Sequence, residues 1–141
     1  MEGYFAYLKW EDSFLLDSEI TLFINNSVKK TQEFYKIISI NNNIQFSSLL
    51  KSPEEENRVM IKINPEKYKN IWDLFFLIKP YALKSIYIYN QSEDPISYLF
   101  SFRCLDKNKK VTGLGNIIQT ELFQIYSTLK EIHNNNLANK R

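Results

Sequence analysis

Alternation of apolar and polar residues dominates the first half of the chain and predicts β-strands. Between residues 14 and 24, the even positions are mostly apolar, whereas the odd positions include Asp17, Glu19 and Thr21 together with Phe23. This period of two is typical of a half-exposed strand. Residues 57–63 alternate in the same way, and residues 4–10 read as a strand that is covered on both sides because both of its faces are apolar.

The remaining strands are predicted from less regular sequence patterns. Residues 28–40 suit either a helix or a strand, and we favour a strand because β-branched residues gather at the end of the segment. Residues 41–57 are mostly polar and hold only a short strand around Ile44 to Phe46. Further strands are expected over residues 82–89 and 96–105, then a turn over residues 106–110 and a short strand at Val111 and Thr112.

Two helices are predicted from capping residues and from apolar stripes. Asn64 is a suitable N-cap and Pro65 suits the first helical position, and the apolar stripe that follows ends at Pro80. The second helix starts at Asn116, with Gln119 as its capping-box partner. Its stripe consists of Ile118, Leu122, Ile125, Leu129 and Ile132, which Phe123 and Tyr126 widen.

The order of these elements favours an α+β fold. We expect mainly antiparallel sheet with the central helix and the C-terminal helix packed on one face, in what resembles a duplicated strands-plus-helix plan. The chain has 141 residues, 44% of them hydrophobic and 15% aromatic, which suffices for one core without disulfides. Residues 1–134 are therefore predicted as a single domain, with a frayed tail over residues 135–141.

The composition also suggests where in the cell the protein is located. Cys104 is the single cysteine and cannot form an internal disulfide, which favours a reducing compartment. Residues 1–4 show no basic segment leading into an apolar run, and the apolar run Leu74 to Ile78 is much shorter than the ~20 residues that span a bilayer. We expect a cytoplasmic protein without a membrane partner.

No arrangement of reactive residues predicts catalysis. His133, the single histidine, is expected near the surface at the end of the last helix, and Cys104 is expected to pack as a small apolar residue. One cysteine and one histidine give no metal site, and the turn from Gly113 to Asn116 lacks the lysine of phosphate-binding loops. The sequence does not rule out catalysis by a pair of carboxylates, but no feature of it selects one pair. The protein is therefore predicted to be no enzyme, with no cofactor.

Charge placement points to binding of a macromolecule. The formal net charge is only +2, but acidic and basic residues gather in separate segments. An acidic surface could cover the basic active site of a nuclease. The residues predicted to bind such a partner are Glu11, Asp12, Asp17, Glu19, Glu54, Glu55 and Glu56.

Basic segments and aromatic residues support an alternative. Lysines lie at positions 29, 30, 67 and 69 and again at 107, 109 and 110, and Tyr87 and Tyr89 occupy alternate strand positions. Lysines can contact phosphates while aromatic rings stack on bases. The alternative is therefore a module that binds single-stranded nucleic acid.

The central helix carries a resemblance to a known family. The run from Tyr68 to Trp72, preceded by an alternating strand, resembles immunity proteins of bacterial contact-dependent growth inhibition systems. The resemblance implies a small cytosolic protein that binds a cognate toxin domain and neutralises it by non-covalent occlusion of its active site. A phage-encoded inhibitor of host defence would act by the same mechanism on another target.

The succession of elements carries a second resemblance. Strands followed by a helix, repeated once, look like the plan of Whirly and Pur-type single-strand binders. That resemblance implies binding of single-stranded nucleic acid, although the near-neutral charge departs from it. The oligomeric state is left open by the sequence.

Overall fold

The computed structural model describes residues 15–78, 86–88, 96–104, 107–115 and 122–138. The strand predicted over residues 4–10, most of the segment 82–89, and the predicted cap at Asn116 with its partner Gln119 lie outside these residues.

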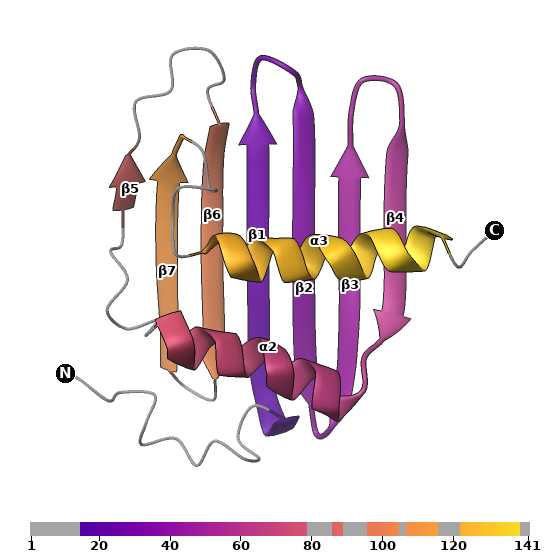
Figure 1. The fold of residues 1–141 in the computed structure, drawn as a ribbon, viewed down its shortest axis with the longest axis vertical. Coiled ribbons are helices and arrows are strands. Elements are labelled where there is room, and N and C mark those ends of the chain that lie inside the picture. The colour runs from indigo at the N-terminus through magenta and orange to yellow at the C-terminus, as the bar shows by residue number, and fades with distance from the viewer. Residues whose placement is uncertain (1–14, 79–85, 89–95, 105–106, 116–121, 139–141) are drawn as a thin grey trace.

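One continuous sheet forms the body of the protein (Figure 1). Its seven strands have the spatial order β4-β3-β2-β1-β6-β7-β5, and every neighbouring pair is antiparallel except β5 with β7. The strands are β1 (Asp17–Asn26), β2 (Thr31–Ile40), β3 (Asn43–Lys51), β4 (Glu56–Lys62), β5 (Ile86–Ile88), β6 (Ile96–Cys104) and β7 (Lys107–Leu114). The predicted α+β fold with mainly antiparallel sheet is confirmed.

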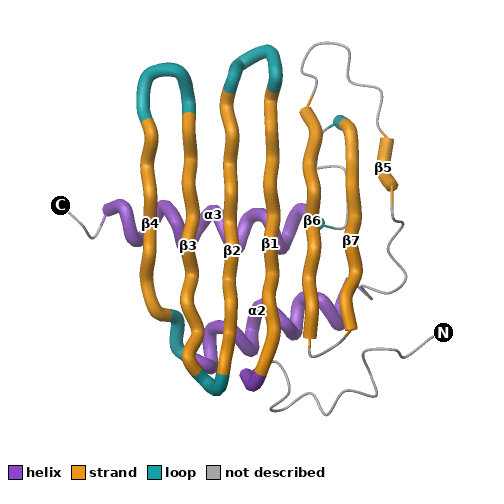
Figure 2. The backbone as a smooth tube through the Cα atoms, turned by 180° about the vertical axis from the view of Figure 1, so that it is seen from behind, coloured by secondary structure: helices purple, strands orange, loops and turns teal. Residues whose placement is uncertain are grey.

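Both long helices cross the same side of this sheet, as Figures 1 and 2 show from opposite sides. They are α2 (Pro65–Ile78) and α3 (Phe123–Ala138). Helix α2 begins where the sequence predicts, because the side-chain oxygen of Asn64 accepts a hydrogen bond from the backbone N–H of Lys67 at 2.7 Å. Helix α3 continues to Ala138, past the domain boundary drawn at residue 134.

The core lies between the helices and the covered side of the sheet. Alternate residues of β1 and β6 point to it, and the stripes of α2 and α3 close it from the other side. The predicted shared face of β6 is confirmed, since Tyr98, Phe100, Phe102 and Cys104 are all buried. The largest fully buried side chains include Trp72, Tyr35, Tyr68, Phe46, Phe100 and Phe102.

Tight turns keep the first four strands adjacent. In the β1–β2 turn, the side-chain oxygen of Asn26 accepts hydrogen bonds from the backbone N–H groups of Val28 and Lys29 at 3.1 and 3.0 Å. The β2–β3 turn places Asn41 and Asn42 at positive φ (49° and 68°), which asparagine tolerates better than most residues. Residues 28–40, which suited either a helix or a strand, form the end of the β1–β2 turn followed by strand β2.

Two strands are longer than expected. Strand β3 continues through Ser47 and Ser48 to Lys51, because it pairs with β2 on one side and β4 on the other along this length. Residues 107–110, predicted as part of a turn, belong to β7, where they pair with β6 from Ser101 to Cys104. Pairing with a neighbouring strand outweighs the weak strand propensity of lysine and asparagine there.

Candidate binding site on the open sheet face

The side of the sheet that faces away from the helices carries the candidate site. Figure 2 views the molecule from this side, and no described helix or strand crosses it. We name it the open face and define it by the residues that alternate with the core positions. They are Asp17, Glu19, Thr21, Phe23 and Asn25 on β1, Gln32, Phe34, Lys36, Ile38 and Ile40 on β2, Asn43, Gln45, Ser47, Leu49 and Lys51 on β3, Glu56, Arg58, Met60 and Lys62 on β4, Ser97, Leu99, Ser101 and Arg103 on β6, and Asn108, Lys110, Thr112 and Leu114 on β7.

An apolar row runs across the middle of the open face. Phe23 and Phe34 are register partners on the two central strands, and both are half-buried. Leu49 continues the row beyond Phe34, and Leu99 continues it beyond Phe23. Cross-strand neighbours on one face have Cβ atoms about 5 Å apart, so the two phenylalanine side chains lie next to each other on the open face. We name these four residues the aromatic row.

The sequence contained a signal for this row. Phe23 occupies a position in β1 where the alternation otherwise places Asp17, Glu19 and Thr21. An aromatic residue on a polar face has no role in the core, so it is a candidate for contact with a partner. Its partner Phe34 could not be recognised, because the register between β1 and β2 comes only from the structure.

Charges on the open face are unequal. Each acidic side chain lies beside a basic one, whereas three lysines take part in no ion pair within the described residues. The acidic pairs are Asp17 with Arg103 at 3.0 Å, Glu19 with Lys36 at 3.9 Å, and Glu56 with Arg58 at 2.9 Å. The three lysines are Lys51, Lys62 and Lys110. The open face therefore carries a net positive charge, more than the whole-chain charge of +2 suggests.

The acidic residues predicted to bind a partner are spread out: Asp17, Glu19 and Glu56 share the open face but lie at opposite ends of it. Asp17 and Glu19 begin β1, whereas Glu54 and Glu55 lie in the β3–β4 turn and Glu56 starts β4. The register places Glu56 in the row of Asn25, eight residues along β1 from Asp17, or about 27 Å at ~3.4 Å per residue. Glu11 and Asp12 lie outside the described residues.

The basic and aromatic residues of the alternative are also dispersed. Lys110 lies on the open face, whereas the alternation of β7 places Lys109 on the helix side, and Lys67 and Lys69 are on α2. The side chain of Tyr87 and all of Tyr89 lie outside the described part. The structure thus gathers positive charge and aromatic rings, but mostly from residues that the sequence had not selected.

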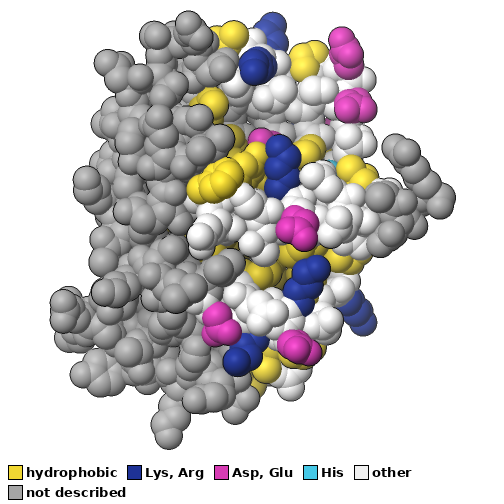
Figure 3. Space-filling view, viewed as in Figure 1, with side chains coloured by type: hydrophobic (Ala, Val, Ile, Leu, Met, Phe, Trp, Pro, Cys, Tyr) yellow, Lys and Arg dark blue, Asp and Glu magenta, His cyan; other side chains and the backbone are white. Residues whose placement is uncertain are grey.

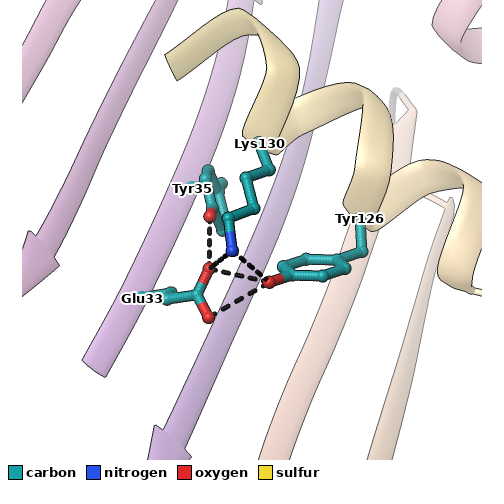
Figure 4. A network of polar contacts seen from close by, with 4 residues as sticks. All are labelled: Glu33, Tyr35, Tyr126 and Lys130. Atoms are coloured by element: carbon teal, nitrogen blue, oxygen red, sulfur yellow. Dashed lines mark hydrogen bonds and ion pairs between the residues drawn. The ribbon is translucent and has the colours of Figure 1, made fainter. Parts of the chain in front are cut away.

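A polar network fastens α3 to the helix side of the sheet, and Figure 4 shows its four side chains converging. The hydroxyls of Tyr35 and Tyr126 donate to Glu33 Oε1 at 2.5 and 3.0 Å, and Lys130 Nζ donates to the hydroxyl of Tyr126 at 3.1 Å. Burial and the adjacent Glu33 carboxylate raise the pKa of both tyrosines. Both phenols therefore stay protonated as hydrogen-bond donors, and the network holds structure together rather than supplying a base or nucleophile.

His133 is buried, contrary to the surface position expected from sequence. Its exposed fraction is 0%, and its Nδ1 lies 2.5 Å from the hydroxyl of Ser48 on β3. The helix crosses the sheet at this point, so the residue faces the core instead of solvent. Ser48 is also buried, and this pair is therefore closed to a substrate.

Other candidate reactive groups give no site. Cys104 is buried, and burial raises the pKa of its thiol to about 11, so the neutral form prevails and the residue packs as an apolar side chain. No group of three or more histidine, cysteine, aspartate or glutamate residues in the described ranges is placed to hold a metal ion. Charged side chains of both signs are scattered over the helix side in Figure 3.

Comparison with known protein families, with curated proteins and with solved structures found no match. Among the described residues, neither helix combines the length and the apolar character that crossing a bilayer requires.

Proposed function

We propose that the protein binds single-stranded nucleic acid on the open face. The observation that carries the proposal is the coincidence of the Phe23 and Phe34 rings with uncompensated lysines on the same side of the sheet. Aromatic rings offer stacking surfaces to any unpaired base, and lysines attract the phosphate backbone. Antiparallel sheets use this combination in several modules that bind single strands.

A single strand suits this surface better than a duplex does. The bases of a duplex are already stacked on each other and are not free to stack on aromatic side chains of a protein surface. A dedicated duplex-binding domain also carries a stronger basic excess than the net charge of +2 in this chain. In this proposal, the aromatic row contacts the bases. The three lysines that take part in no ion pair within the described residues attract the phosphates, and this attraction weakens as salt rises.

Neutralisation of a toxin is the second candidate function. Glu54 and Glu55 are exposed in the β3–β4 turn, and an acidic turn can complement the basic active site of a nuclease. The positive charge of the open face does not complement such a site, so the contact would involve the turn rather than the sheet. An inhibitor of a host defence protein would use the same turn.

Fluorescence anisotropy with labelled 12-residue oligonucleotides, one of uridine and one of deoxythymidine, tests the main proposal. We expect wild type to bind with an affinity that falls as salt rises. Replacing both Phe23 and Phe34 by alanine should weaken binding about tenfold or more, because each stacked base contributes about 1–3 kcal/mol. Tyrosine at both positions should restore it, because the stacking surface is kept.

A matched control separates stacking from a general loss of aromatic surface. Phe123 is 36% exposed on α3, so Phe123→Ala removes an exposed ring from the opposite side of the molecule and should leave oligonucleotide binding unchanged. Absence of salt-sensitive binding by wild type would contradict the proposal. Tight one-to-one binding to a toxin domain encoded in the neighbouring reading frame, lost in Glu54→Lys with Glu55→Lys, would establish the second candidate instead.

A further inference from the structure

Two hollows lie side by side on the open face over β2, β3 and β4. One has a volume of about 370 Å³ and is lined by Lys36, Gln45, Met60 and Lys62 among others. The other has a volume of about 440 Å³, and Phe34, Leu49, Arg58 and Met60 are among its lining residues. Ser47 lines both. Each volume lies in the range of sites that hold small organic groups.

Met60 separates the two hollows. Its side chain is 77% exposed, the highest value among the exposed large hydrophobic residues of the described chain. The register places Met60 beside Ser47 and Lys36 in one row, with the row of Arg58, Leu49 and Phe34 on one side and the row of Lys62, Gln45 and Ile38 on the other. Adjacent rows of one face are two residues apart, or about 7 Å. Met60 therefore stands as a ridge between two neighbouring recesses.

We propose that these hollows hold two successive bases of the bound single strand, with the Met60 side chain inserted between them. This inference rests on the proposed function, and it assigns the place and the manner of base contact. Methionine is unbranched and polarisable, and it is one of the residues that proteins insert between base steps. The offset of about 7 Å between rows suits an extended strand whose bases have been drawn apart.

The lining residues supply what two bases and their phosphates need. Phe34 gives one hollow an aromatic wall continuous with the aromatic row. Gln45 gives the other hollow both a donor and an acceptor, and its side chain makes no hydrogen bond within the described residues. Arg58 and Lys62 lie on β4, one of the two edge strands of the sheet, where they can contact the phosphates on either side of Met60.

The test uses the adenine analogue 2-aminopurine, whose fluorescence is quenched when it stacks on a neighbouring base. A deoxythymidine 12-mer with two adjacent 2-aminopurines is titrated with the full chain. Insertion of Met60 should raise the fluorescence on binding of wild type, and Met60→Ala should lose more than half of that increase. The dissociation constant should change by less than about fivefold, because phosphate contacts supply most of the affinity.

Leu114→Ala is the matched control, since Leu114 is a 53% exposed aliphatic residue on the same face but on β7, away from the hollows. It should keep the full fluorescence increase. If the fluorescence of Met60→Ala at saturating protein rises as much as that of wild type, the insertion of Met60 between the bases is contradicted. The proposed function would be left intact. If anisotropy shows no binding of the oligonucleotide by wild type, both proposals fail, so the two failures are distinguishable.

Discussion

The hydroxyl of Ser48 and Nδ1 of His133 lie 2.5 Å apart across the interface between β3 and α3. Both residues are buried, and Nε2 of the imidazole has no hydrogen-bond partner among the described residues. Burial lowers the pKa of His133, with a smaller opposing effect of Glu33 and a further lowering by Lys130. The histidine is therefore held neutral where helix and sheet meet.

This arrangement predicts a loss of stability in mild acid. Because the folded-state pKa lies below the ordinary value of 6.5, the unfolded chain takes up a proton at His133 before the folded protein does. The free energy of unfolding should fall as pH decreases below about 6.5, by up to about 1.4 kcal/mol per pH unit until the folded pKa is reached. Urea unfolding of wild type at pH 7.5, 6.5 and 5.5 measures this fall.

His133→Asn isolates the contribution of the imidazole. The variant should be less stable than wild type at pH 7.5, but its free energy of unfolding should change less between pH 7.5 and 5.5. Carboxylates titrate alike in both proteins and cancel in the difference. An identical pH dependence of the two proteins would show that His133 does not titrate differently on folding.

Tyr126 and Glu33 should stabilise the packing of α3 jointly. Tyr126→Phe removes a hydroxyl that lies 3.0 and 3.2 Å from the two oxygens of Glu33, and we expect a loss of about 1 kcal/mol, since the carboxylate is partly exposed to solvent. A double-mutant cycle with Glu33→Gln, followed by urea unfolding, measures the coupling. Strictly additive effects would contradict a direct interaction.

Gly113 should be intolerant of any side chain. It is the register partner of Tyr98, and a methyl group built on Gly113 would overlap the tyrosine ring. Gly113→Ala should cost about 1–3 kcal/mol in the free energy of unfolding, because the buried ring has to move. Asn108→Ala, on the exposed side of the same strand, should change stability by less than about 0.5 kcal/mol.

The proposed binding predicts a definite salt dependence. Each lysine that contacts a phosphate of a single strand contributes about 0.7 to the slope of log K against log salt. Lys62→Ala and Lys110→Ala should each reduce the magnitude of the slope by about that amount, whereas Lys67→Ala, on α2 at the other side of the sheet, should not change it. Equal slopes in wild type and the three variants would show that the nucleic acid does not contact Lys62 or Lys110.

The sequence alone determined the local elements and the fold class. The period of two in β1 and β6, the Asn64 cap before Pro65, and the stripe from Leu122 to Ile132 each depend on residues close together in the chain, so short-range stereochemistry sufficed to identify them. The extent of β3 and β7 could not be obtained in this way, because their polar residues become strand only by pairing with a neighbour.

Only the tertiary structure decided what lies beside what. Antiparallel register brought Phe34 next to Phe23, paired Asp17 with Arg103, and left Met60 standing between two hollows on the open face. The crossing of α3 over β3 buried His133 against Ser48 instead of leaving it at the surface. The physical reason is that a binding surface depends on relations between strands, whereas alternation within one strand fixes only which residues share a side.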